Sequence, residues 1–465
     1  MARTRQVKLK EISTQTAPST IAQMGEQFRN LGLRRPIPKD TVLSLGMDET
    51  NPRKRGRLVR QRWVADLNAY GGRKARQSFT YDAFVPDPIV DLNPLLPADV
   101  ALIVGEAEQA VRQLNAGPVV ANLESIARQL LRAESLASSR IEGLALSQRR
   151  LAEAIFAPDR SDITAVSVLN NIAAMDMSIR LGSETRPFSV GDIRTIHRTL
   201  LNTPIDQRIA GVVRTTQNWI GGRAITPLGA QFIPPPAPEV PALLGDLCAF
   251  INRDDIPAVA QAAIAHAQFE TIHPFADGNG RVGRCLIHVV LRRRSVAARY
   301  VPPVSVILAT SASAYIAGLT DYRAGDVAGW CSLFATALRT AGDRALALTV
   351  RLQELQEEWR ERAGRPRRDS TARKILALLP AYPIMNVETA RALAGVSDEA
   401  ARVALQTLEQ AGILSQVTVG RRNRAWTAKE LFGVVNAFEW DIATPDDPVE
   451  TRRPSPTARR LAHRR

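Results

Sequence analysis

The sequence predicts a mainly α-helical protein with more than one domain. Hydrophobic residues make up 45% of the chain and aromatic residues only 5%, and this mixture, which leans on Ala, Leu, Ile and Val, favours helices. Apolar residues also recur at helical spacing over long stretches. Since 465 residues exceed what one hydrophobic core usually serves, two or three domains are expected.

The helical pattern begins at Pro97. A second apolar stripe runs from Leu123 to Leu131, and both stripes predict helices that face a core. Residues 211–241 are rich in Gly and Pro, so a surface hairpin or loop interrupts the helices there. The first stripe consists of Val100, Ile103, Val104, Ala107, Val111 and Leu114.

Helices are predicted again at residues 240–251 and 258–272. His273-Pro274 ends the second of them, and the pattern restarts after Gly280 and runs to Val290, so a short loop joins two helices. Two further segments close this part of the chain, a polar connecting helix at 346–361 and a linker at 362–369.

A small separate domain is predicted from residue 370 to about 438. It contains three helical patterns, at 372–379, 387–394 and 397–411, followed by an alternating segment at 413–426 that predicts a hairpin around Gly420. This order resembles a winged helix-turn-helix.

Two interpretations of this C-terminal domain stay open. Arg421, Arg422 and Arg424 at the hairpin tip could meet DNA phosphates. Asp398 and Glu399 open the recognition helix and would face DNA with the wrong charge, so target docking or homodimerisation is the alternative.

The positive charge of the chain is concentrated at its ends. Residues 1–80 hold 17 Lys and Arg against 6 Asp and Glu, and residues 451–465 hold 6 Arg and no acid. Residues 1–80 are interpreted as a basic extension with one short helix near 21–31, and residues 439–465 as a basic tail. Both ends are expected either to contact nucleic acid or acidic partners, or to be solvated.

Cysteine usage and hydropathy predict a cytoplasmic protein that does not contact a membrane. Cys248, Cys285 and Cys331 are odd in number and lack metal-ligand spacing, which argues against a disulfide framework or a zinc site. No apolar stretch reaches the length of a membrane span, and the amino terminus lacks the apolar region of a signal peptide.

The loop between the two central helices contains Asp-Gly-Asn-Gly-Arg at 277–281. Glycine permits backbone geometry that other residues resist, so this turn can direct its N–H groups outward. The helix that follows adds its positive end, which predicts an anion site. Arg281 and Arg284 are three positions apart and can lean toward that end from one helical face. Together these features predict a polyphosphate pocket.

Two residues beside this pocket indicate that the site is catalytic. Asp277 would supply oxygen ligands beside bound phosphates, the arrangement that suits magnesium. His273 lies close by in the loop and is available as a general base. A calcium-binding EF-hand is excluded because its sixth and twelfth positions would be Val282 and His288, where Gly and Glu are needed. The remaining alternative is a structural corner in which His273 only packs.

Residues 273–284 read His-Pro-Phe-Ala-Asp-Gly-Asn-Gly-Arg-Val-Gly-Arg. This string resembles the signature of the Fic (filamentation-induced-by-cAMP) family of protein adenylyltransferases at each defining position. The resemblance covers residues 80–345 and implies a Fic-type helical bundle with a β-hairpin flap, with ATP as substrate, Mg²⁺ as cofactor and a protein hydroxyl as acceptor. Further segments that look like Fic segments are 81–86, 211–222, 234–236 and 265–270.

The resemblance also implies a role for each residue of the loop. His273 would take the proton from the target hydroxyl, which attacks the α-phosphate of ATP, while Asp277 holds magnesium. The amides and side chain of Gly278-Asn279-Gly280 would form the anion hole. Arg284 would meet the γ-phosphate, and Arg281 would support the phosphate side. Phe275 would be a buried anchor, and Tyr315 and Trp330 would line the adenine side or close the core, with the core favoured for Trp330. The flap that pairs with the target backbone would contain Ile220, Gly221, Gly222 and Phe232.

An inhibitory element is expected upstream of this loop. Ser138-Ser-Arg-Ile-Glu142-Gly143 is similar to the family's inhibitory motif, in which Glu142 would pair with Arg284 and deny it to the γ-phosphate. The alternative interpretation is a capping glutamate before a helix-ending glycine.

The sequence therefore predicts an autoinhibited protein adenylyltransferase that transfers AMP from ATP to an unknown target protein and to itself. The alternatives are a DNA-binding regulator that uses the Fic domain as a nucleotide sensor, and an enzyme that removes AMP or transfers another phosphate-linked group. The predicted domains are 1–80 (extension), 81–145 (N-terminal helices with the inhibitory helix), 146–345 (catalytic core), 346–369 (connecting helix and linker), 370–438 (winged-helix-like domain) and 439–465 (tail).

Overall fold

The computed structural model describes residues 55–64, 77–116, 123–157, 162–222, 226–419 and 423–440. The short helix predicted near 21–31, the tail beyond 440, and Gly420, Arg421 and Arg422 at the predicted hairpin tip lie outside the described residues.

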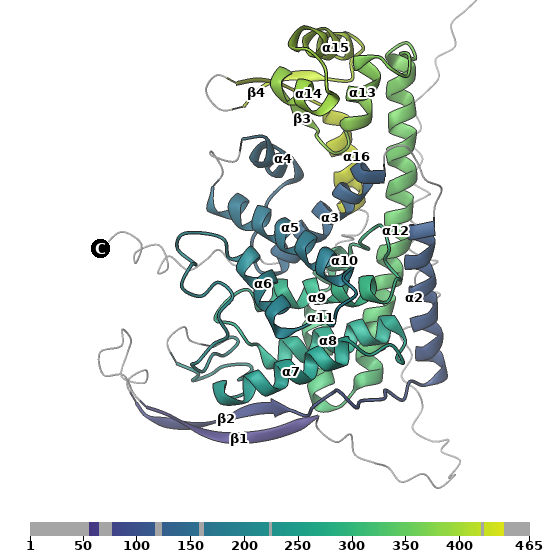
Figure 1. Cartoon of the computed structure of the whole chain (residues 1–465). Helices are drawn as coiled ribbons and strands as arrows, with labels where there is room; N and C mark the ends of the chain where they lie inside the picture. The colour runs from purple at the N-terminus through teal and green to yellow at the C-terminus, as the bar shows by residue number, and fades with distance from the viewer. Residues whose placement is uncertain are drawn as a thin grey trace, which may run out of the picture. The chain divides into compact units, whose positions relative to one another are not determined.

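The prediction of a mainly α-helical fold is confirmed (Figure 1). The helical body packs around a central apolar core to which most of its helices contribute. Its helices are α2 (Ala98–Ala116), α3 (Leu123–Ile141), α4 (Gln148–Phe156), α5 (Ile163–Gly182), α6 (Val190–Leu200), the 3₁₀ helix η3 (Ala237–Glu239), α7 (Val240–Ile251), α8 (Ala258–Ile272), α9 (Asn279–Arg293), α10 (Val304–Thr310), α11 (Ala312–Ala324) and α12 (Val327–Arg362).

Helix α8 is the centre of this body, and all 15 of its residues are buried. Its alanine-rich sequence allows close approach of the neighbouring helices, of which α9, α7 and α12 pack directly on it. The helix ends at His273, whose φ of 48° lies in the left-handed region, and Pro274 follows. A non-glycine residue seldom adopts this conformation, so the surrounding structure holds the backbone there in place.

The chain enters the fold through a two-stranded antiparallel ribbon that the sequence pattern does not predict. Strand β1 (Gly56–Trp63) pairs with β2 (Phe79–Pro86) along its whole length, so residues 56–63 form a strand inside the segment interpreted as a basic extension. Their arginine-rich sequence, Gly-Arg-Leu-Val-Arg-Gln-Arg-Trp, hides the alternation expected of a strand. The ribbon packs on the loop region 211–236, where the Trp63 and Trp219 rings meet edge to face at 5.6 Å.

Helix α12 corrects the prediction of a separate connecting helix at 346–361. It is one helix of 36 residues that begins against α8 and runs along α2 (Figure 1). Its second half carries the C-terminal domain, whose core includes Leu352 and Trp359 of α12.

The C-terminal domain contains the three helices and the hairpin that the sequence predicts, together with a short strand and a final helix that it does not. The sheet order is β3-β5-β4. The winged-helix assignment and its function stay predictions. The elements are α13 (Thr371–Leu378), β3 (Ile384–Met385), α14 (Val387–Ala394), α15 (Asp398–Gln410), β4 (Ser415–Val419), β5 (Asn423–Thr427) and α16 (Lys429–Trp440).

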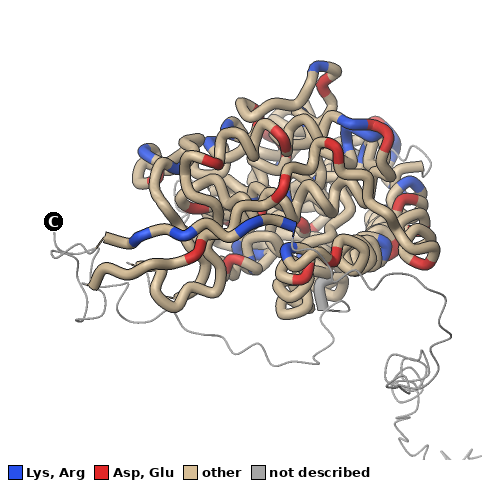
Figure 2. The backbone as a smooth tube through the Cα atoms, turned by 90° about the horizontal axis from the view of Figure 1, so that it is seen from below, with Lys and Arg blue, Asp and Glu red and all other residues tan. Residues whose placement is uncertain are grey.

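Acidic and basic residues are interspersed over the described body (Figure 2). Within the described ranges, no single helix is long and apolar enough to cross a membrane, although α10 and α11 together meet that test across a bend of 100°.

Helix α12 offers a matched test of the shared core. Leu352 is 1% exposed and Leu346 on the same helix is 38% exposed. We expect Leu352→Ala to lower the free energy of unfolding by about 2–5 kcal/mol, because it leaves a cavity, and Leu346→Ala to change it by less than about 1 kcal/mol. Denaturant unfolding of both variants measures this difference, and equal losses would contradict the packing of α12.

Candidate active site

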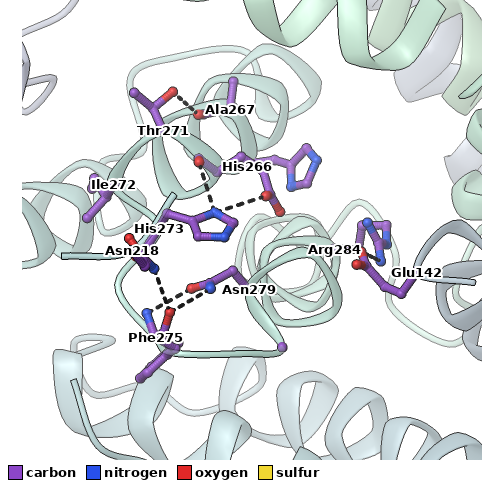
Figure 3. A network of polar contacts seen from close by, with 12 residues as sticks. Glu142, Asn218, His266, Ala267, Thr271, Ile272, His273, Phe275, Asn279 and Arg284 are labelled. Carbon is purple, nitrogen blue, oxygen red and sulfur yellow. Dashed lines mark hydrogen bonds and ion pairs between the residues drawn. The ribbon is translucent and has the colours of Figure 1, made fainter. Parts of the chain in front are cut away.

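The loop between α8 and α9 begins at His273 (Figure 3). Its ring is mostly buried, with 18% of the side chain exposed, and Nδ1 faces the Glu270 carbonyl oxygen at 3.4 Å. With the proton on Nδ1, the lone pair lies on Nε2. Burial lowers the pKa of His273 to about 4, so the imidazole is neutral at physiological pH and can accept a proton.

Asn279 holds the loop in shape. Its side-chain oxygen accepts a hydrogen bond from the Phe275 amide at 2.9 Å, and its Nδ2 donates to the Phe275 carbonyl at 2.8 Å. Both polar atoms of the Asn279 side chain thus bond within the loop, and its predicted contribution to an anion hole stays a prediction. Gly278 precedes α9 with a φ of 77°, which explains the need for glycine there.

Arg284 is almost completely buried, with 1% of its surface exposed, and α3 supplies its partners. Nε donates to the Ser138 hydroxyl at 2.8 Å and Nη2 to the Ser138 carbonyl at 2.8 Å. Nη2 also pairs with Glu142 Oε1 at 2.8 Å. The predicted pairing of Glu142 with Arg284 is therefore present in the structure, and Ser138 of the same motif binds the same guanidinium, a contact that the sequence analysis does not predict.

The Glu142 carboxylate also covers the first turn of α9. A Cβ added at Gly280 would lie 2.0 Å from Glu142 Oε1, so only glycine leaves room for the carboxylate there. Burial acts to raise the pKa of Glu142, but the Arg284 guanidinium outweighs it and holds that pKa below its usual value. An anionic carboxylate thus occupies the helix end where the sequence predicts phosphate.

Asp277 and Arg281 border the same helix end. The Asp277 side chain is 68% exposed, and its Oδ1 accepts from the Gly278 amide at 2.7 Å, which orients the carboxylate while leaving it open to solvent. Arg281 is buried, donates to the Ser167 hydroxyl of α5 at 2.9 Å and lies 4.0 Å from Asp277. Within the described residues, no group of three or more His, Cys, Asp or Glu is arranged so that it could hold a metal ion by itself.

Three further residues hold the loop and are not predicted from the sequence. His197 of α6 has Nε2 at 3.0 Å from the Asp277 carbonyl, and its ring stacks on Phe275 at 3.7 Å. Arg214 donates to the His273 carbonyl at 2.9 Å, as does Asn218 at 3.1 Å. These residues contact backbone atoms of the loop, and no sequence spacing indicates such contacts.

Beneath the loop lies a group of buried ionisable residues. Glu270 is 7% exposed, its Oε1 has no hydrogen-bond partner, and its Oε2 lies 3.9 Å from His273 Nδ1. Burial raises the pKa of Glu270 to about 7. The sequence pattern gives no indication of such a carboxyl group, because Glu270 is the one acidic residue of a helix that is mostly apolar.

Tyr315 lies in the core, which is one of the two places expected for it. It is 3% exposed, and its hydroxyl is hydrogen-bonded to His266 Nε2 at 2.8 Å, so in this structure it supports the core behind Arg284 and offers no surface to a base. Trp330 is 1% exposed and donates from Nε1 to the Ala263 carbonyl at 2.8 Å, which confirms its predicted core role.

The predicted flap is a narrow hairpin. Ile220 and Phe232 form an antiparallel bridge, and Gly221 and Gly222 turn the chain with φ values of 72° and 73°. Arg323 of α11 stacks over the Phe232 ring at 4.0 Å. The hairpin is therefore anchored on one side; residues 223–225 lie outside the described residues.

Comparison with known proteins places this site in a family. Residues 187–291 match the family model described as Fic/DOC, so this part of the chain is a Fic domain. The protein adenylyltransferase fic-1 of Caenorhabditis briggsae is 32% identical over 167 residues, 33% of this chain and 30% of that protein. A probable protein adenylyltransferase of Aquifex aeolicus is 47% identical over 64 residues, 14% of this chain and 20% of that protein.

These matches are partial, since the chain spans about 30% of the length of its Caenorhabditis relative. Among solved structures, a Fic family protein from Desulfovibrio desulfuricans aligns with 72% of this chain and 97% of its own, at 20% identity and a TM-score of 0.44.

The raised pKa of Glu270 predicts an unusual pH dependence of stability. Between its ordinary pKa of 4.5 and its folded value of about 7, the folded protein keeps the proton that the unfolded chain releases. Ionisation therefore destabilises the fold as pH rises through this window. We expect Glu270→Gln to be more stable than the parent at pH 8, by on the order of 2–3 kcal/mol, and to lose this advantage by pH 4.5. Denaturant unfolding at both pH values measures it, and a pH-independent difference would contradict the assignment.

Proposed function

We propose that this protein is an autoinhibited protein adenylyltransferase that transfers AMP from ATP to a hydroxyl group of a target protein. The single observation that supports this most is the arrangement of His273, the amide end of α9 and Arg284 around one anion site. The names of the relatives agree with it.

In the proposed reaction, the target hydroxyl loses its proton to Nε2 of His273, its oxygen bonds to the α-phosphorus of ATP, and the bond to the β-phosphate breaks to release diphosphate. The neutral imidazole is the form required for this step, and its burial keeps it in that form. The amides of Asn279 and Gly280 at the start of α9 would stabilise the charge on the phosphates, whereas the Gly278 amide is bonded to Asp277.

Asp277 is the residue that would hold magnesium, which supplies positive charge to the phosphates when it is bound. Its exposed carboxylate and fixed Oδ1 fit that role. Arg284 would meet the γ-phosphate once Glu142 has left, and Arg281 would remain beside Asp277. The flap between Ile220 and Phe232 would align the target chain by backbone pairing.

Glu142 has the position of a brake on this reaction. Its carboxylate pairs with the Arg284 guanidinium and covers the amino-terminal end of α9, and ATP needs both. Productive ATP binding therefore requires the Glu142–Arg284 ion pair to open. Self-modification and a cytoplasmic location belong to the same proposal. An enzyme that removes AMP from its target with the same site is an alternative within the Fic class, because Glu142 is intact in this chain.

We expect His273→Ala to reduce AMP transfer by about 10²–10⁴-fold, the usual contribution of a general base, while ATP binding remains. Incubation with labelled ATP and magnesium measures transfer, and calorimetry measures binding. Transfer at the parental rate would contradict the role of His273.

We expect Glu142→Gly to raise both AMP transfer and self-labelling by at least about tenfold, because Arg284 and the α9 amides become free for ATP. Glu142→Gln is the matched control: it keeps the shape but removes the charge, so a smaller increase is expected. Equal labelling of the parent protein and Glu142→Gly would exclude the brake, whereas a gain of phosphate instead of AMP in the mass of the product would exclude adenylyl transfer.

A further inference from the structure

Helix α3 connects two places that the proposed function leaves separate, the active site and the C-terminal domain. Its last turn carries Ser138, which holds Arg284, and Glu142 follows directly, with the turn closed by the bond from the Leu144 amide to the Ser139 carbonyl at 3.0 Å. Its first half lies against the loop after α13 and against α12 (Figure 1).

Polar contacts attach the first half of α3 to the C-terminal domain. The Ser125 hydroxyl donates to the Ala377 carbonyl at 3.3 Å, and Gln129, 3% exposed, donates to the Pro380 carbonyl. The Arg128 guanidinium lies over the Tyr382 ring, 5.5 Å from its centroid.

Apolar packing continues this attachment toward the active site. Ile126, Leu130 and Ala137 belong to the same buried cluster as Leu376 and Leu379 of the C-terminal domain. Ala137 directly precedes Ser138, so the cluster reaches the residues that hold Arg284 without a gap. Because α3 is one helix without Gly or Pro, a shift of its first half is transmitted to its last turn.

Helix α4, which follows the Glu142 turn in the chain, is attached to the C-terminal domain as well. Ala152 shares a buried cluster with Ile384 and Ala425 of the C-terminal sheet, and Phe156 and Phe432 pack against that cluster. The turn that contains Glu142 therefore lies between two helices, each of which contacts the C-terminal domain.

We propose that the C-terminal domain controls the adenylyltransferase site by holding α3 and α4 in the position that pairs Glu142 with Arg284. A partner that draws this domain away from α3 would open the pair and admit ATP. This inference rests on the proposed function for its effect on transfer, but the mechanical link between the two sites can be observed without transfer.

The test uses the full chain with Gln129→Ala and Tyr382→Ala combined, and follows amide hydrogen exchange and AMP transfer. Both substitutions are far from the active site. We expect faster exchange at residues 377–382, where the contact is lost, together with faster exchange at 138–144 and a rise in transfer of at least about fivefold. In a Glu142→Gly background the same pair should change transfer by less than about twofold, since the brake is already absent.

Arg402→Ala is the matched control, because Arg402 lies on α15 and bonds to the exposed Glu399 at 3.1 Å; exchange at 138–144 should not change. The proposal is overturned if exchange rises at 377–382 and stays at the parental rate at 138–144. It is also overturned if both segments keep the exchange rates of the parent protein. The contacts of Gln129 and Tyr382 would then not hold the C-terminal domain against α3. Faster exchange at both segments with no transfer by Glu142→Gly would keep the link and reject the proposed function.

Discussion

The ion pair between Arg284 and Glu142 is the contact on which the proposed regulation depends. Arg284 is buried, and a buried guanidinium without a negative partner is strongly destabilising. The two acceptors that Ser138 supplies to Arg284 are neutral. The positive charge of the guanidinium therefore has to be balanced by a carboxylate or by a phosphate. In the proposed regulation, Glu142 and a phosphate of ATP are alternative partners of Arg284 that exclude each other, and the structure shows the pair with Glu142.

The rest of the fold holds Arg284 and its alternative partners at the amino-terminal end of α9. Helix α8 is buried on all sides, which fixes where His273 ends it, and the contacts of His197, Arg214 and Asn218 to loop carbonyls fix the path from α8 to α9. Glu134 at the middle of α3 adds a second attachment, because its buried carboxylate accepts from the Ser305 amide at 2.8 Å and faces His288 Nε2 at 3.1 Å. The turn that contains Glu142 and the loop from α8 to α9 are therefore held by one continuous set of polar and apolar contacts.

Much of this arrangement follows from local sequence signals. The bounds of α7, α8 and α14 agree with prediction because Gly and Pro mark their ends and apolar residues repeat at helical spacing. The motif residues His273, Asp277 and Arg284 are identifiable because the chemistry of an anion site requires a specific order of residue types. The pairing of Glu142 with Arg284 is expected only from the resemblance to the family's inhibitory motif, because 142 positions separate the two residues.

Other features depend on tertiary contacts that no local pattern records. Strand β1 is rich in arginine and becomes a strand through pairing with β2. Tyr315 is covered by the core through its hydrogen bond to His266, 49 positions away, which depends on how α8 and α11 pack. The supporting role of His197 arises in the same way, through a backbone carbonyl 80 positions away.

Competition for Arg284 is tested most directly by calorimetric titration of ATP and of AMP into His273→Ala and into His273→Ala with Glu142→Gly, where turnover cannot interfere. The account predicts that removal of Glu142 tightens ATP binding by at least about tenfold, equivalent to about 1.4 kcal/mol, and leaves AMP binding almost unchanged, because only ATP carries the phosphate that needs Arg284. Equal ATP affinity in the two proteins, or an equal gain for AMP, would contradict it.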